Sequence, residues 1–102
     1  MATLVWRAPM RYFSPGDEAA FFTWLDSIPG VVSVVGSGRE LQIRLRSRRL
    51  SQQGLRELIA LYTRYGGHMG ELAQFATEAN SAWFKAPNAA WHQAVFGTRN
   101  AV

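Results

Sequence analysis

The sequence predicts a small α+β domain in which helices cover one face of a three-stranded sheet. Three observations lead to this prediction: strict alternation in residues 39–46, a capped helical pattern over residues 51–66, and a β-branched run at residues 31–35. Strands and helices that alternate along the chain, with one hairpin, are typical of this class. Because 102 residues suffice for one core, we expect a single domain over residues 1–102.

The central strand is predicted from residues that alternate in polarity after Arg39. The apolar set is Leu41, Ile43 and Leu45, and the polar set is Gln42, Arg44 and Arg46. Successive side chains of a strand point to opposite faces, so this strand buries one face only. Ser51 then fits the N-cap of a helix, which Gly66 ends as a left-handed C-cap.

The N-terminal half supplies two further strands and another helix. A first strand is expected at residues 3–7, and Ser14 followed by Pro15 predicts a helix that runs to about Ile28. The second strand covers residues 31–35, and the glycine-containing turn at residues 36–38 joins it to the central strand as a hairpin. In an unbroken strand, Val32 and Val34 point to the side opposite Val31 and Val35, so both faces of this strand are expected to be covered.

The C-terminal third is expected to form short helices. Residues 68–77 have apolar spacing for about two helical turns, and a last helix is predicted from Pro87 to about Phe96. The whole order is thus β-α-β-β-α-α-α. This order resembles a ferredoxin-like unit lacking the last strand, with sheet order first, third, second and the two main helices on one face. The resemblance implies a fold and no function.

The other sheet face would then show Arg44, Arg46 and Gln42 beside Val32 and Val34. We expect such a mixed face to be covered, either by the C-terminal segment or by another chain. The interface candidates are therefore Val32, Val34, Trp83 and Trp91. The two tryptophans have a second interpretation as satellite core, because aromatic residues bury large areas in small domains.

Positive charge is concentrated in one stretch of the chain. The formal net charge is +4, and residues 39–56 hold six arginines with Glu40 as the only acidic residue. The binding candidates are Arg44, Arg46, Arg48 and Arg49. They could contact nucleic-acid phosphates or an acidic protein, or they could form a solvated face paired with Glu40, Glu57 or Asp26.

The sequence indicates no catalytic residue, metal site or cofactor. It holds no cysteine, no signal-peptide run and no apolar stretch of membrane-spanning length, which predicts a cytoplasmic protein without a membrane partner. We therefore expect a non-enzymatic interaction module that binds itself or another protein through its sheet face and aromatic C-terminal segment. The alternatives are nucleic-acid binding through the arginines, and a ligand site or enzyme around His68 and Glu71.

Overall fold

The computed structural model describes residues 1–7 and 11–97 and confirms the α+β prediction. The elements are, in order, β1 (Ala2–Trp6), α1 (Pro15–Ser27), β2 (Val31–Ser37), β3 (Glu40–Leu45), α2 (Gln52–Tyr65), the 3₁₀ helix η1 (Met69–Phe75), α3 (Ser81–Phe84) and α4 (His92–Phe96). The strands form one sheet of order β1-β3-β2, as predicted. No helix in the described part of the chain is long and apolar enough to cross a membrane.

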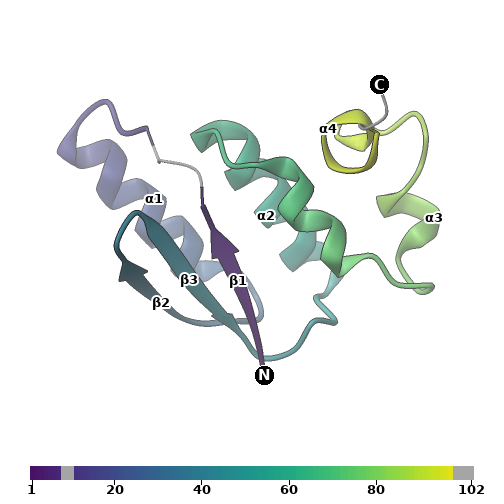
Figure 1. The fold of residues 1–102 in the computed structure, drawn as a ribbon, viewed down its shortest axis with the longest axis horizontal. Helices are drawn as coiled ribbons and strands as arrows, with labels where there is room; N and C mark the ends of the chain where they lie inside the picture. The colour runs from purple at the N-terminus through teal and green to yellow at the C-terminus, as the bar shows by residue number, and fades with distance from the viewer. Residues whose placement is uncertain (8–10, 98–102) are drawn as a thin grey trace.

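β3 is the middle strand and runs antiparallel to both neighbours. β1 and β2 are therefore parallel to each other, and α1 is the crossover between them. α1 and α2 lie side by side on one face of the sheet (Figure 1). In the register, Leu4 and Val34 both lie opposite Ile43, while Thr3 and Ser33 both lie opposite Arg44.

The core lies between the sheet and these two helices. Leu41, Ile43 and Leu45 are buried, which confirms the predicted inward face of β3. β1 adds Trp6, whose ring centroid lies 5.3 Å from that of Phe21 on α1 and 4.1 Å from that of Tyr62 on α2. The further buried side chains from the helices include Leu25, Leu55, Leu58, Ile59, Leu61 and Tyr65.

Local capping explains where the two main helices begin and end. Ser14 Oγ accepts a hydrogen bond from Asp17 N at 3.1 Å, and Ser51 Oγ accepts one from Gly54 N at 3.0 Å. Both contacts satisfy an amide that a first helical turn leaves free. Gly66 adopts φ 78°, the left-handed C-cap predicted from the sequence.

The hairpin differs from the prediction in its turn and in the directions of two valines. The turn consists of Gly38 and Arg39 only, with Gly38 at φ 62°, which suits the first central position of a type II′ turn. Between Val31 and Ser33, β2 carries a bulge, so two residues advance against one on β3. The predicted directions of Val34 and Val35 are therefore both wrong: Val34 lies opposite Ile43 and packs against the core, and Val35 lies opposite Gln42 and is exposed.

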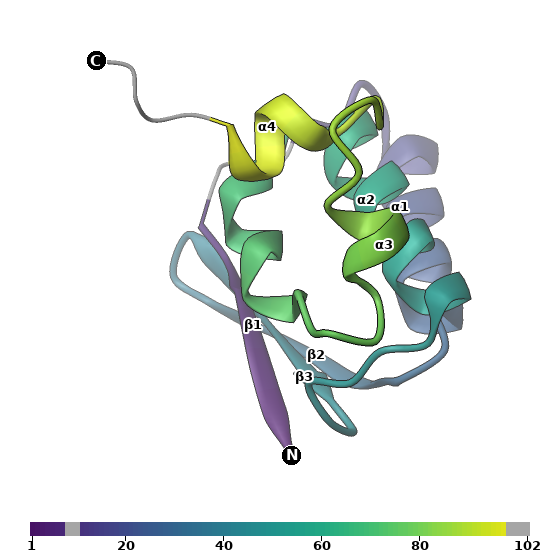
Figure 2. The same ribbon diagram turned by 90° about the vertical axis from the view of Figure 1, so that its right-hand side faces the viewer.

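The C-terminal segment forms a second layer on the outer side of α2. Figures 1 and 2 show η1 beside α2 and β1, and α3 and α4 beyond α2 on the side away from α1. The predicted helix from Pro87 begins only at His92, because turns precede it. The helical turn α3 (Ser81–Phe84) lies where the sequence indicated no helix.

Candidate interaction surface

The sheet face away from α1 and α2 carries two rows of side chains that run across all three strands. Antiparallel register places Thr3, Arg44 and Ser33 in one row. The second row, by the same register, contains Val5, Gln42 and Val35. We call these six residues the open face. It combines a guanidinium, an amide and two hydroxyls with two valines.

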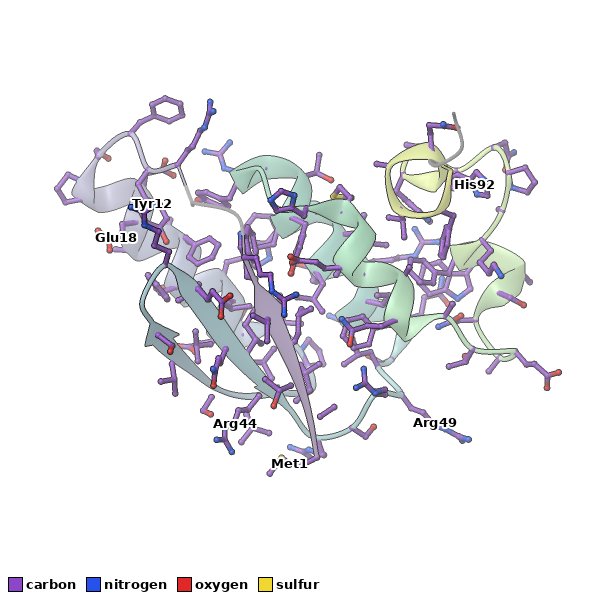
Figure 3. All side chains as sticks on the ribbon, in the orientation of Figure 1. Met1, Tyr12, Glu18, Arg44, Arg49 and His92 are labelled. Carbon is purple, nitrogen blue, oxygen red and sulfur yellow. The ribbon has the colours of Figure 1, made fainter. Side chains whose placement is uncertain are left out.

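The described residues leave the open face largely accessible. Thr3, Arg44 and Val35 are exposed, and Val35 retains 49% of its accessible surface. Figure 3 shows the Arg44 side chain pointing away from the helices. The C-terminal segment packs on α2 and η1 instead, so in residues 11–97 it does not provide the internal cover that the sequence allowed.

The four candidate arginines are all exposed, but they do not form one patch on the sheet. Arg44 belongs to the open face, whereas Arg46, Arg48 and Arg49 follow the end of β3. Arg48 donates to the side-chain oxygen of Gln74 on η1. Figure 3 shows Arg44 and Arg49 projecting outward on either side of Met1.

Two of the acidic partners suggested by the sequence, Glu40 and Glu57, are occupied elsewhere. Glu40 pairs with Arg7, with 3.6 Å between Oε2 and Nε. Glu57 accepts a hydrogen bond from the indole Nε1 of Trp24 at 2.6 Å. Among the described residues, the four candidate arginines therefore form no ion pair.

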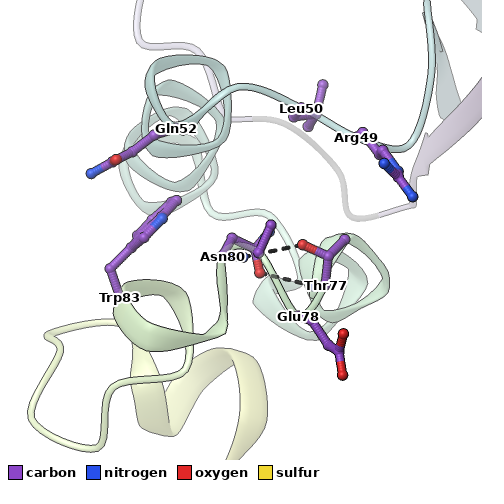
Figure 4. A pocket seen from close by; sticks show the side chains of 8 residues that line it. Arg49, Leu50, Gln52, Thr77, Glu78, Asn80 and Trp83 are labelled. Carbon is purple, nitrogen blue, oxygen red and sulfur yellow. Dashed lines mark hydrogen bonds between the residues drawn. The ribbon is translucent and has the colours of Figure 1, made fainter.

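The largest cleft lies between the N-terminus of α2 and residues 77–83. Its volume is about 710 Å³, and it is lined by Arg49, Leu50, Gln52, Thr77, Glu78, Ala79, Asn80 and Trp83. Figure 4 shows Thr77 and Asn80 hydrogen-bonded to each other, while Arg49 points away from Trp83. Since the polar groups are turned to one another or to solvent, the cleft gathers no set of groups suited to acid–base chemistry.

His68 and Glu71 do not form a joint site. Glu71 Oε1 accepts from the Tyr62 hydroxyl at 2.7 Å, and its Oε2 accepts from Arg7 N at 3.4 Å. Burial raises the pKa of Tyr62, and the hydrogen bond to Glu71 raises it further. His68 is exposed. Glu71 thus joins η1 to α2 and β1, and no group of three potential metal ligands occurs in residues 1–7 and 11–97.

Trp83 and Trp91 lie in the second layer, half-buried. The guanidinium of Arg56 lies over both rings, 4.7 Å from the centroid of Trp83 and 5.5 Å from that of Trp91. Trp91 Nε1 also donates to the carbonyl of Phe84 at 2.7 Å. No local pattern indicates this role of Arg56, because the contacts join residues far apart in the chain.

A comparison with protein-family models, curated proteins and solved structures found no significant match to this chain. Function is therefore argued from surface chemistry, since a fold alone assigns no activity. On the open face, apolar side chains lie on regular secondary structure beside a guanidinium that has no carboxylate partner among the described residues.

Proposed function

We propose that this chain is a non-enzymatic protein-interaction module and that the open face is its docking surface. The supporting observation is the register that places Arg44 between Thr3 and Ser33, next to the row that holds Val5 and Val35. An antiparallel sheet can leave one face solvated, so accessibility alone carries little weight. Arg44 carries the argument, because arginine is enriched at protein interfaces and in their hot spots.

The chemistry of the open face also indicates which kind of partner surface it would bind. The neighbours of Arg44 in its row are short hydroxyl side chains, which leave the guanidinium fork free to bind a carboxylate through two hydrogen bonds. The valines on both sides of Gln42 offer a shallow apolar strip with one amide at its centre. A partner surface that carries an acidic residue beside an apolar one fits this arrangement.

The experiment places a photo-activated benzophenone side chain at Thr3, in the cells that naturally make the protein. The matched control carries the same group at Ala20, an exposed position on α1. We expect a cross-linked protein adduct at Thr3 that is absent at Ala20 and is lost when Arg44→Glu is added. No adduct at Thr3, or equal adducts at both positions, would contradict the proposal.

Nucleic-acid binding is the second candidate, and one observation favours it. Arg44, Arg46 and Arg49 are exposed and have no carboxylate partner among the described residues. The open face, however, has no aromatic side chain on which a base could stack. The test measures affinity for a random duplex and a single strand at low and moderate salt, where phosphate contacts predict a steep loss with salt. Absence of binding, or an affinity that does not change with salt concentration, would contradict nucleic-acid binding.

A further inference from the structure

We infer that β2 pairs with β2 of a second copy of this chain, antiparallel and across a two-fold axis, so that two three-stranded sheets join into one. The inference goes beyond the proposed docking at the open face, because it adds a contact between two copies of this chain. It assigns the contact to the free edge of the sheet, next to the open face. Three features support it: the backbone groups of β2, the side chains of β2 and the absence of charged side chains from that strand.

The backbone of β2 presents unpaired polar groups along its outer edge. Ser37 and Glu40 close a two-residue turn, so they form a hydrogen-bonded pair of the ladder. Such pairs alternate along an antiparallel ladder, which makes Val35 and Gln42 the next one. The N–H and C=O groups of Val34 and Gly36 therefore point away from β3, toward the free edge.

The side chains of β2 provide little of the protection usual at an edge. Residues 31–37 include no charged residue and no proline, the two features that most often prevent edge pairing. Val32 and Val35 retain 50% and 49% of their accessible surface. They are the exposed large hydrophobic residues that lie within a described strand or helix. The bulge at Val32 twists one end of the edge and leaves residues 34–37 regular.

A second copy can form hydrogen bonds with the outward backbone groups of β2 without bringing like charges together. In a register centred on Val35, that residue faces Val35 of the other copy, and the outward backbone groups of Val34 meet those of Gly36. No ionised side chain lies in the new strand pair, although the chain carries a net charge of +4. Arg44 lies one strand inward, so the two Arg44 side chains stand about three strand spacings apart, roughly 14 Å, beyond the screening length at physiological salt.

Gly36 permits a test that changes the free edge and little else. A Cβ at this position would meet no heavy atom within 4 Å outside its own chain neighbours, so Gly36→Ala has room. Proline removes the outward N–H, whereas alanine keeps it. Sedimentation equilibrium of the wild type and both variants from about 5 µM to about 500 µM covers the range in which one strand pair dissociates.

We expect the wild type and Gly36→Ala to dimerise and Gly36→Pro to weaken the dimer by about tenfold or more, because both copies lose a donor. Amide exchange of Val34 and Gly36 should slow as wild-type concentration rises, whereas that of Val35 should not. Unfolding curves verify that Gly36→Pro is folded, and the exchange experiment needs no variant.

The inference would be overturned by a wild type that stays monomeric at about 500 µM, or by amide exchange at Val34 and Gly36 that does not change with protein concentration. A dimer that Thr3→Lys dissociates and Gly36→Pro leaves intact would also overturn it, by moving the contact to the open face. A monomer that still gives the Thr3 cross-link to another protein would end this inference and leave the proposed function standing.

Discussion

The guanidinium of Arg56 on α2 lies 4.7 Å above the ring of Trp83, which belongs to a helix of only four residues. So short a helix has no stability of its own in water, and tertiary contacts must hold it. The same guanidinium lies 5.5 Å from the ring of Trp91. One arginine thus fixes two points of the C-terminal layer to α2.

Replacing Arg56 should therefore loosen the C-terminal layer. For Arg56→Gln we expect a loss of about 1 kcal/mol in the free energy of unfolding, the scale of cation–π contacts at an exposed site. Urea unfolding followed by tryptophan fluorescence measures the loss. Arg39→Gln is the matched control, because Arg39 is exposed in the hairpin turn. Equal unfolding curves for the two variants would show that the stacking contributes nothing.

Gly54→Ala should destabilise the protein, against the usual effect of alanine in a helix. Alanine normally favours a helix over glycine by about 1 kcal/mol. A Cβ at Gly54, however, would lie 2.6 Å from the carbonyl oxygen of Pro29, a backbone atom that cannot rotate away. We expect a net loss of about 1–3 kcal/mol on thermal unfolding.

Gly16→Ala provides the comparison for Gly54→Ala, because its Cβ would meet only Ser14 Oγ at 3.7 Å. This variant should be neutral or slightly stabilising. If both substitutions stabilise the protein, the close approach of α2 to the turn after α1 is wrong.

Asp17 should make the protein sensitive to acid. Its pKa is lowered, chiefly by the hydrogen bond from Phe13 N, and also by the Tyr65 hydroxyl and by Arg64. A lowered folded-state pKa means that this stability is present above the unfolded value of 3.8 and is lost as the pH falls through the folded value.

The gap in stability between wild type and Asp17→Asn should therefore be greatest near neutral pH and should close in strong acid. Thermal unfolding across the acid range measures it. Tyr65→Phe removes only one of the donors and should give a smaller gap in the same direction. Wild-type and Asp17→Asn curves that run parallel down to strong acid would contradict this account.

Tyr62 should make the protein sensitive to alkali. Burial raises its pKa above the ordinary value of 10, and burial also raises the pKa of Tyr12 to about 12. A raised folded-state pKa gives stability that is present below pH 10 and declines as the pH rises, because the unfolded chain ionises first. Tyr62→Phe should lose about 1–2 kcal/mol at neutral pH, since Glu71 loses its hydroxyl donor.

The same variant should lose less of its remaining stability above pH 10 than the wild type loses. Unfolding in urea at neutral and alkaline pH provides both comparisons. Tyr12→Phe is the control, because the Tyr12 hydroxyl has no hydrogen-bond partner among the described residues, so its removal should cost less at neutral pH. An identical neutral-pH loss in both variants would argue against the Glu71 contact.

The parts of the fold that were predicted correctly depend on local chemistry. The caps at Ser51 and Gly66 use residues within one turn of the helix they bound, so the sequence displays them directly. The inward face of β3 follows from the period of its own side chains, as buried Ile43 confirms. The sheet order was predicted by analogy with the element order of a ferredoxin-like unit, and the preference for right-handed crossovers placed the two main helices on one face.

The parts that were missed depend on partners distant in sequence or on one extra residue. Val34 points to the core because the bulge shifts the alternation of β2 by one, and β-branched residues on both sides of Ser33 conceal that shift. Glu71 could not be assigned a structural role, since its partners come from α2 and the end of β1. Whether the open face binds a partner is a question of surface chemistry that alternation alone cannot answer.

The position of η1 limits which edge of the sheet can accept a strand from another molecule. η1 lies along the outer side of β1, and Glu71 accepts from the backbone amide of Arg7 just beyond that strand. Among the described residues, the β2 side of the sheet is the edge that no other element lies along. A dimer formed through β2 would therefore have no free sheet edge to which a further strand could add. Assembly by strand addition would stop at the dimer and would not continue into a fibril.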